Sequence, residues 1–107
     1  MEKITIQYVP EVEYYIENLI DILFEEEYFG FEIYAQNYGA KIIDFVEENI
    51  ISFPAKKTPI QLKYFGSNYI FYKSNQRTTW YIFFEKSENN YLVTNIINSH
   101  SKEAKWL

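Results

Sequence analysis

The chain has 107 residues, a formal net charge of −5, no cysteine, and 21% aromatic and 48% hydrophobic residues. This composition excludes a disordered tail, a disulfide framework, a thiolate nucleophile and cysteine-ligated zinc. A chain of this length is expected to form one domain, residues 1–107, around one core. Its start has no signal-peptide pattern, and no stretch approaches the roughly 18 apolar residues of a membrane span. We therefore expect a cytoplasmic protein with no membrane partner.

The first half of the chain carries one strand signal and two helix signals. Residues 3–9, KITIQYV, alternate apolar and polar side chains, which predicts a half-buried strand. Pro10 favours a helix start, and apolar residues at helical spacing predict a helix to about Glu27. After Gly30, a second apolar stripe predicts a helix from Phe31 to about Ser52. The two helices are expected to form a hairpin.

Beyond Pro54 the pattern changes to short strands separated by turn residues. The predicted strands are PIQLKYF (59–65), NYIFYKS (68–74), TTWYIFFEK (78–86) and YLVTNIINSH (91–100). The simplest topology for them is an antiparallel meander. We therefore predict an α+β fold of order β-α-α-β-β-β, with a further strand where 59–65 pairs, and with the helical hairpin packed on one face of an antiparallel sheet. Strand alternation places Trp80, Ile82 and Phe84 beneath the helices and leaves the other face for function.

Charge is distributed unevenly along the chain. Residues 1–53 contain 12 Asp and Glu against 2 Lys, a net charge of −10. Residues 54–107 contain 3 Glu against 8 Lys and Arg, a net charge of +5. A basic half rich in Tyr, Phe and Trp is typical of surfaces that hold phosphates and stack bases. The acidic half is equally compatible with helices that use Glu only for solubility.

The element order, together with RTTWYIFFEK and LVTNIINSH, resembles the RelE/ParE superfamily of toxins from bacterial toxin–antitoxin (plasmid stabilisation) modules. The resemblance implies a small antitoxin protein as partner, bound through an extended or helical segment. It also implies one of two activities. RelE-like toxins cleave messenger RNA on the ribosome by attack of the 2′-hydroxyl on the adjacent phosphate, whereas ParE-like toxins inhibit DNA gyrase without this chemistry.

Metal-independent cleavage requires cations at the phosphate and groups that move two protons, so neither a metal nor a cofactor is expected. Arg77, the only arginine, lies in the turn between two aromatic strands and can clamp a phosphate, with Lys73 across the hairpin as a second cation. His100, the only histidine, ends the last strand and suits proton transfer near neutral pH. Tyr81 completes the predicted site. It stands where many RelE-like enzymes carry an arginine in a Tyr-Arg-x-x-Tyr pattern.

A second group of residues is predicted to stack RNA bases or to bind a partner. If the strands align, the open face presents aromatic side chains beside Lys73, and the C-terminal tail adds a cation and an indole; the predicted members are Tyr69, Phe71, Phe83, Lys102 and Trp106. For Phe71 and Phe83 a place in the core or in a partner interface is favoured over base stacking.

These residues indicate a RelE-like messenger RNA endonuclease. The missing strand arginine and the acidic total charge instead favour a toxin that acts by binding alone, as ParE does. A third alternative is an unrelated α+β interaction domain.

Overall fold

The computed structural model describes residues 3–18, 32–51, 55–73 and 78–107, and in 32–39 it describes the backbone alone. The described elements are β1 (Thr5–Tyr8), α1 (Pro10–Glu17), α3 (Glu32–Asn49), β2 (Lys56–Lys57), the 3₁₀ helix η1 (Ile60–Phe65), β3 (Asn68–Lys73), β4 (Thr79–Ser87), β5 (Asn90–Asn98) and the 3₁₀ helix η2 (Lys102–Trp106). The predicted α+β class is confirmed. The predicted continuation of the first helix to Glu27 and the predicted hairpin turn lie outside the described residues.

The strands form one five-stranded sheet in the order β1-β5-β4-β3-β2. The pairs β2–β3, β3–β4 and β4–β5 are antiparallel, as predicted for the meander. The pair β1–β5 is parallel, so the sheet is mixed, and the prediction of an antiparallel sheet is wrong at this edge. β4 pairs with one side of β5, and the other side of β5 is the open edge of the meander. β1 pairs with that open edge and runs in the same direction as β5.

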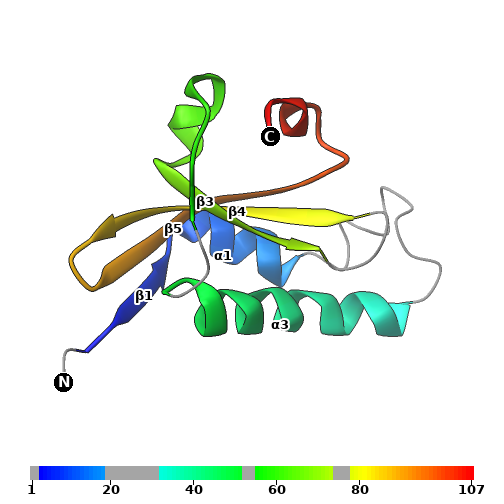
Figure 1. The fold of residues 1–107 in the computed structure, drawn as a ribbon. Coiled ribbons are helices and arrows are strands. Elements are labelled where there is room, and N and C mark those ends of the chain that lie inside the picture. Colours follow the sequence, from blue (N-terminus) through cyan, green and yellow to red (C-terminus); the bar gives the residue numbers. More distant parts are fainter. Residues whose placement is uncertain (1–2, 19–31, 52–54, 74–77) are drawn as a thin grey trace.

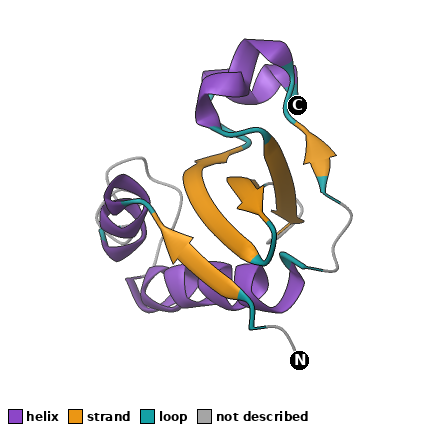
Figure 2. Cartoon of the chain, turned by 90° about the vertical axis from the view of Figure 1, so that its left-hand side faces the viewer, coloured by secondary structure: helices purple, strands orange, loops and turns teal. Residues whose placement is uncertain are grey.

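Helices α1 and α3 cover one face of the sheet, and η1 and η2 stand on the other (Figure 1). Pro10 occupies the first turn of α1, where its missing N–H breaks no helical hydrogen bond. Glu11 and Glu13 lie in the same turn, where their negative charges interact favourably with the positive end of the helix dipole. Figure 2 shows β1 at the edge of the sheet, between the two helices. None of the helices in the described parts of the chain is long and apolar enough to cross a membrane.

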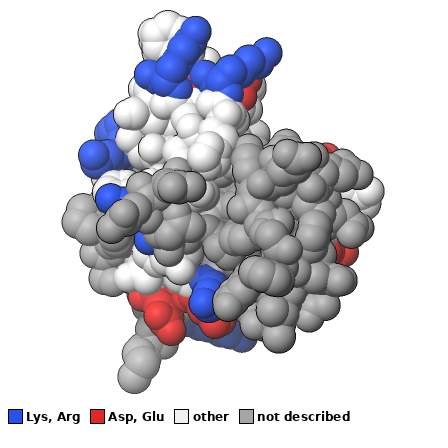
Figure 3. Space-filling view, turned by 90° about the vertical axis from the view of Figure 1, so that its right-hand side faces the viewer, with Lys and Arg blue, Asp and Glu red and all other residues white. Residues whose placement is uncertain are grey.

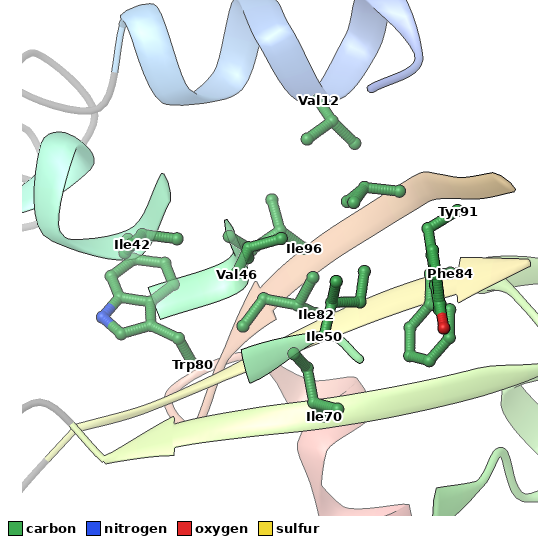
Figure 4. Close-up of a cluster of buried hydrophobic side chains, with 11 residues drawn as sticks. Val12, Ile42, Val46, Ile50, Ile70, Trp80, Ile82, Phe84, Tyr91 and Ile96 are labelled. Atoms are coloured by element: carbon green, nitrogen blue, oxygen red, sulfur yellow. The ribbon is translucent and has the colours of Figure 1, made fainter. Parts of the chain in front are cut away.

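The main core lies between the sheet and the helices (Figure 4). Ile42 and Val46 of α3 and Ile50, which directly follows its last residue, recur every four residues. They are buried against the alternating row of Trp80, Ile82 and Phe84 on β4. This confirms the predicted side for these three β4 residues. Aromatic contacts fix the end of the core nearest the β3–β4 connection, where Tyr15 meets the edge of Trp80 at 6.4 Å and Phe45 stacks on Tyr72 at 4.9 Å between ring centroids.

The second face of the sheet carries its own small core. Leu62 of η1, Tyr69 of β3 and Phe83 of β4 are buried together. Around them pack the partly buried side chains of Phe65, Phe71, Tyr81, Ile97 and Leu107. The prediction that this face is left entirely for function is therefore wrong over its central part, because η1 and the C-terminal residue cover it.

Segment 60–65 is a 3₁₀ helix, so the prediction of a strand there is wrong. Residues three apart lie on one side of a 3₁₀ helix, and Leu62 and Phe65 form the side that packs on the sheet. Pro59 precedes the helix and Gly66 ends it with φ +155°, a conformation in which glycine avoids strain. Residues 56–57, which none of the predicted strands covers, form the short strand β2.

A β-bulge in β5 anchors η1 to the sheet. Phe83 pairs with Asn95 and Phe84 with Val93, so Thr94 is left without a strand partner on β4. Its hydroxyl donates a hydrogen bond to the carbonyl oxygen of Phe65. The bulge therefore supplies the polar contact that ends η1 above the second core.

Candidate nucleic-acid interface

The accessible part of the second face lies at the end of the β3–β4 pair. Here Phe71 of β3 stands opposite Tyr81 of β4, which stands opposite Ile97 of β5. Phe71 and Tyr81 are only partly buried, so both residues remain accessible in part to solvent. Lys73 is exposed and pairs with Thr79, two residue pairs beyond Phe71 and Tyr81 and therefore on the same face. The predicted alignment of Phe71, Tyr81 and Lys73 on one face is thus what the strand register gives.

Lys56 joins this group although the sequence did not single it out. Strand β2 places Lys56 opposite Tyr69, at the edge of the same face. Its Nζ lies 5.4 Å from the centroid of the Phe71 ring, a cation–π arrangement. The available signal was a pair of lysines between Pro54 and Pro59, which reads as a solvated connection unless the pairing with β3 is known.

Tyr69 and Phe83, predicted for base stacking, belong to the second core. Phe83 is 0% exposed and Tyr69 7% exposed, so neither ring offers a face to a base. For Phe83 the alternative of a core position holds. Burial raises the pKa of the Tyr69 hydroxyl, with the neighbouring Tyr81 as the smaller cause. Tyr69 meets the Tyr81 ring edge-on at 6.1 Å and thereby helps to orient it.

His100 lies at the end of the β4–β5 ladder. Beyond the last β-strand pair, Ser99 N–H donates to the carbonyl of Thr79 at 2.8 Å, and Thr79 N–H donates to Ser99 Oγ at 3.1 Å. The exposed imidazole follows, with Nε2 3.1 Å from Thr78 Oγ1. Its backbone N–H donates to Oδ1 of the buried Asn98 at 2.8 Å, which fixes the turn. His100 therefore stands at the end of the sheet rather than on the face beside Tyr81.

The remaining predicted residues are separated from this group or lie outside the described residues. Arg77, the predicted phosphate clamp, is outside them and immediately precedes Thr78 in the sequence. Lys102 is exposed at the start of η2. Trp106 is 45% exposed near its end, with Lys105 Nζ 5.1 Å from its ring centroid.

Charge separates the two sides of the sheet. The exposed acidic residues of the described parts of α1 and α3 are Glu11, Glu13, Glu17, Asp44, Glu47 and Glu48. Exposed lysines of the β2, η1, β3 and η2 elements include Lys56, Lys63, Lys73, Lys102 and Lys105, whereas Lys41 is exposed on α3 and Lys86 on β4 beside Tyr91. Figure 3 shows lysine side chains projecting at the top of the molecule, where Figure 1 places η1 and η2. Among the described residues, the exposed acidic side chains of α1 and α3 and these five lysines therefore lie on opposite sides of the sheet, which favours a polyanion on the η1–η2 side.

This arrangement can hold a polyanion with unstacked bases, because it offers cations beside solvent-facing rings. Within the described residues no group of three or more His, Cys, Asp and Glu side chains is placed to hold a metal ion.

Comparisons of the chain with protein-family models, with curated proteins and with solved structures gave no match in any of the three.

Proposed function

We propose that this chain is the toxin of a toxin–antitoxin module and a RelE-like endonuclease that cleaves messenger RNA on the ribosome. The observation that carries the proposal is the accessible end of the second face, where Phe71 and Tyr81 stand opposite each other with Lys56 and Lys73 around them. The α+β order of the elements, on which the resemblance to the RelE/ParE superfamily depends, supports it.

In this proposal the lysines neutralise the charge that develops on the phosphate during attack by the 2′-hydroxyl, and Arg77 adds to them from the β3–β4 connection. Tyr81 supplies a hydroxyl beside the phosphate. His100 lies at the end of the neighbouring β4–β5 ladder. Tyr81 and His100 are the two groups proposed to take the 2′ proton and to protonate the 5′ oxygen as its bond to phosphorus breaks. Cytoplasmic location and a cognate antitoxin partner are parts of the same proposal.

A second candidate is a toxin that acts by binding alone, on DNA gyrase or another target. The observation in its favour is that Tyr81 occupies the central-strand position where the resemblance implies an arginine, and that it packs against Tyr69. Such a protein would use the same basic, aromatic surface without transferring protons.

Growth of a bacterial host tests the shared part of both candidates. Induced alone, the chain is expected to arrest growth, and a Lys56→Ala, Lys73→Ala double variant is expected to relieve the arrest. Glu13→Ala is the matched control, because it removes an exposed charge from the opposite side of the sheet. Unimpaired growth with soluble wild-type protein would contradict both candidates. Arrest that persists in the lysine variant would place the functional surface elsewhere.

A further inference from the structure

Tyr64 is an exposed ring that packs against the partly buried Phe65. It is 74% exposed on η1. Its ring lies 4.4 Å from that of Phe65, and Phe65 meets the fully buried Phe83 at 5.2 Å. A ring of this kind loses little conformational entropy when a flat group stacks on it.

A similar combination recurs on η2. Trp106 is 45% exposed, and Lys105 lies over its ring at 5.1 Å. On η1, Lys63 directly precedes Tyr64 and is exposed. The two 3₁₀ helices lie next to one another on the second face (Figure 1). Each helix therefore brings one accessible ring and one cation to the same end of the molecule.

The chemistry of this pairing selects a ligand. Alternating rings and ammonium groups match a chain in which bases alternate with phosphates, provided that the bases are unpaired. The acidic residues of this region are few: Glu85 accepts a hydrogen bond from the Ser67 backbone N–H, and Glu103 is partly buried in η2. A duplex would present only phosphates here, because its bases are stacked on each other.

We infer that η1 and η2 form a binding track for single-stranded RNA, in which bases stack on Tyr64 and Trp106 and phosphates contact Lys63 and Lys105. The inference deepens the proposed function, on which it rests for the identity of the ligand. It extends the RNA contact from the Phe71–Tyr81 end of the sheet onto the two 3₁₀ helices, and it assigns stacking to rings other than the buried Tyr69 and Phe83.

The two tryptophans of the chain provide the readout, because Trp80 is 0% exposed whereas Trp106 reaches solvent. Titration with a short oligouridylate is expected to quench part of the tryptophan emission in a saturable and salt-sensitive way. Trp106→Phe is expected to abolish the quenching, since the remaining Trp80 is enclosed by the main core. Duplex RNA of the same length is expected to quench far less.

Affinity is measured separately by anisotropy of a labelled oligouridylate. Tyr64→Ala is expected to weaken binding roughly five- to hundredfold, the cost typical of one lost base–aromatic stack. Tyr14→Ala is the matched control, because Tyr14 is 68% exposed on α1 beside acidic residues. Lys63→Ala is expected to lower the salt dependence by about one phosphate contact. Circular dichroism verifies that each variant is folded.

The outcomes separate this inference from the proposed function. If the wild type binds oligouridylate but Tyr64→Ala binds as tightly as Tyr14→Ala, or if Trp106 emission does not respond, the track is wrong and the proposed function stands. If Tyr64→Ala changes the oligomeric state and leaves RNA affinity unchanged, the surface is a protein interface and the track is again wrong. If the folded wild type binds no RNA at low salt, with or without ribosomes, both fail.

Discussion

Truncating Ile60 and Leu62 of η1 one at a time, and comparing the two losses of stability, distinguishes the 3₁₀ helix from the strand that its sequence suggests. In a strand, Ile60, Leu62 and Tyr64 point to one face and are buried alike. In the structure Leu62 is 1% exposed in the second core, whereas Ile60 is 81% exposed. The substitutions Leu62→Ala and Ile60→Ala are therefore expected to differ strongly in their effect on the free energy of unfolding.

The magnitude follows from burial. Leu62→Ala removes three buried carbon groups, worth about 2.4 kcal/mol in transfer free energy at about 0.8 kcal/mol each. The cavity left against Tyr69 and Phe83 adds to this, so we expect a loss of about 3 kcal/mol. Ile60→Ala removes a side chain that is mostly in water already, and its effect is expected to stay within about 0.5 kcal/mol.

Urea denaturation followed by circular dichroism measures both values on otherwise identical proteins. Leu62→Ala should shift the midpoint far below that of the wild type, with Ile60→Ala close to the wild type. Equal losses for the two variants would mean that the segment is a strand or that η1 is not docked. The second core, and the description of the binding face built on it, would then be wrong.

Two further predictions concern stability. Burial, with Glu47 as the smaller cause, raises the pKa of the Tyr8 hydroxyl to about 12 in the folded protein. In the unfolded chain this hydroxyl has its ordinary pKa near 10 and therefore loses its proton first as the pH rises. The free energy of unfolding is therefore expected to fall between about pH 10 and pH 12. Because Tyr8 is half-buried, we expect a loss of only about 1 kcal/mol of the free energy of unfolding over this pH range. Tyr8→Phe removes a hydroxyl that has no hydrogen bond within the described residues, and it should abolish this pH dependence, whereas Tyr14→Phe should not. Urea denaturation measures both pH profiles, and equal profiles for the two variants would contradict the prediction. Gly66→Ala is expected to lower the stability of the protein by about 1–3 kcal/mol, because φ is +155° and the new Cβ would lie 2.5 Å from Thr94 Oγ1 and 3.1 Å from Phe83 Cβ. Thermal unfolding measures the change, and an unchanged midpoint would show that η1 ends with a different backbone conformation.

The sequence pattern was sufficient to predict the buried side chains of an element wherever residues at regular spacing all pack against the main core. Residues 80–84 are all apolar, and the alternation of strand side chains correctly predicts which of them face the helices. The stripe on the second helix likewise ends in the buried Ile42, Val46 and Ile50. Each element turns one regularly spaced set of side chains to the main core, so local period and tertiary packing agree there, although β4 also buries Phe83 on its other face.

The pattern failed where the buried set is small and tertiary contacts decide. PIQLKYF alternates like a strand, but only Leu62 and Phe65 find a surface to pack on, and their spacing of three is that of a 3₁₀ helix. The Pro before and the Gly after this segment were the local signal that a short helix begins and ends there. The prediction of the site residues failed for the same reason. Phe83 is buried because η1 packs over it, and a strand over residues 59–65 does not predict this position of η1.

Cleavage of ribosome-bound messenger RNA tests the central claim most directly. Primer extension on stalled ribosomes is expected to show cuts with the wild-type chain, and Arg77→Ala and His100→Ala are each expected to slow cutting by about a hundredfold or more, as loss of a transition-state contact or of a proton-transfer group typically does. Ribosome binding should weaken much less for His100→Ala than for Arg77→Ala, because a role in proton transfer is confined to the chemical step. Wild-type protein that arrests growth but leaves the messenger uncut would contradict the endonuclease and leave the toxin that acts by binding alone.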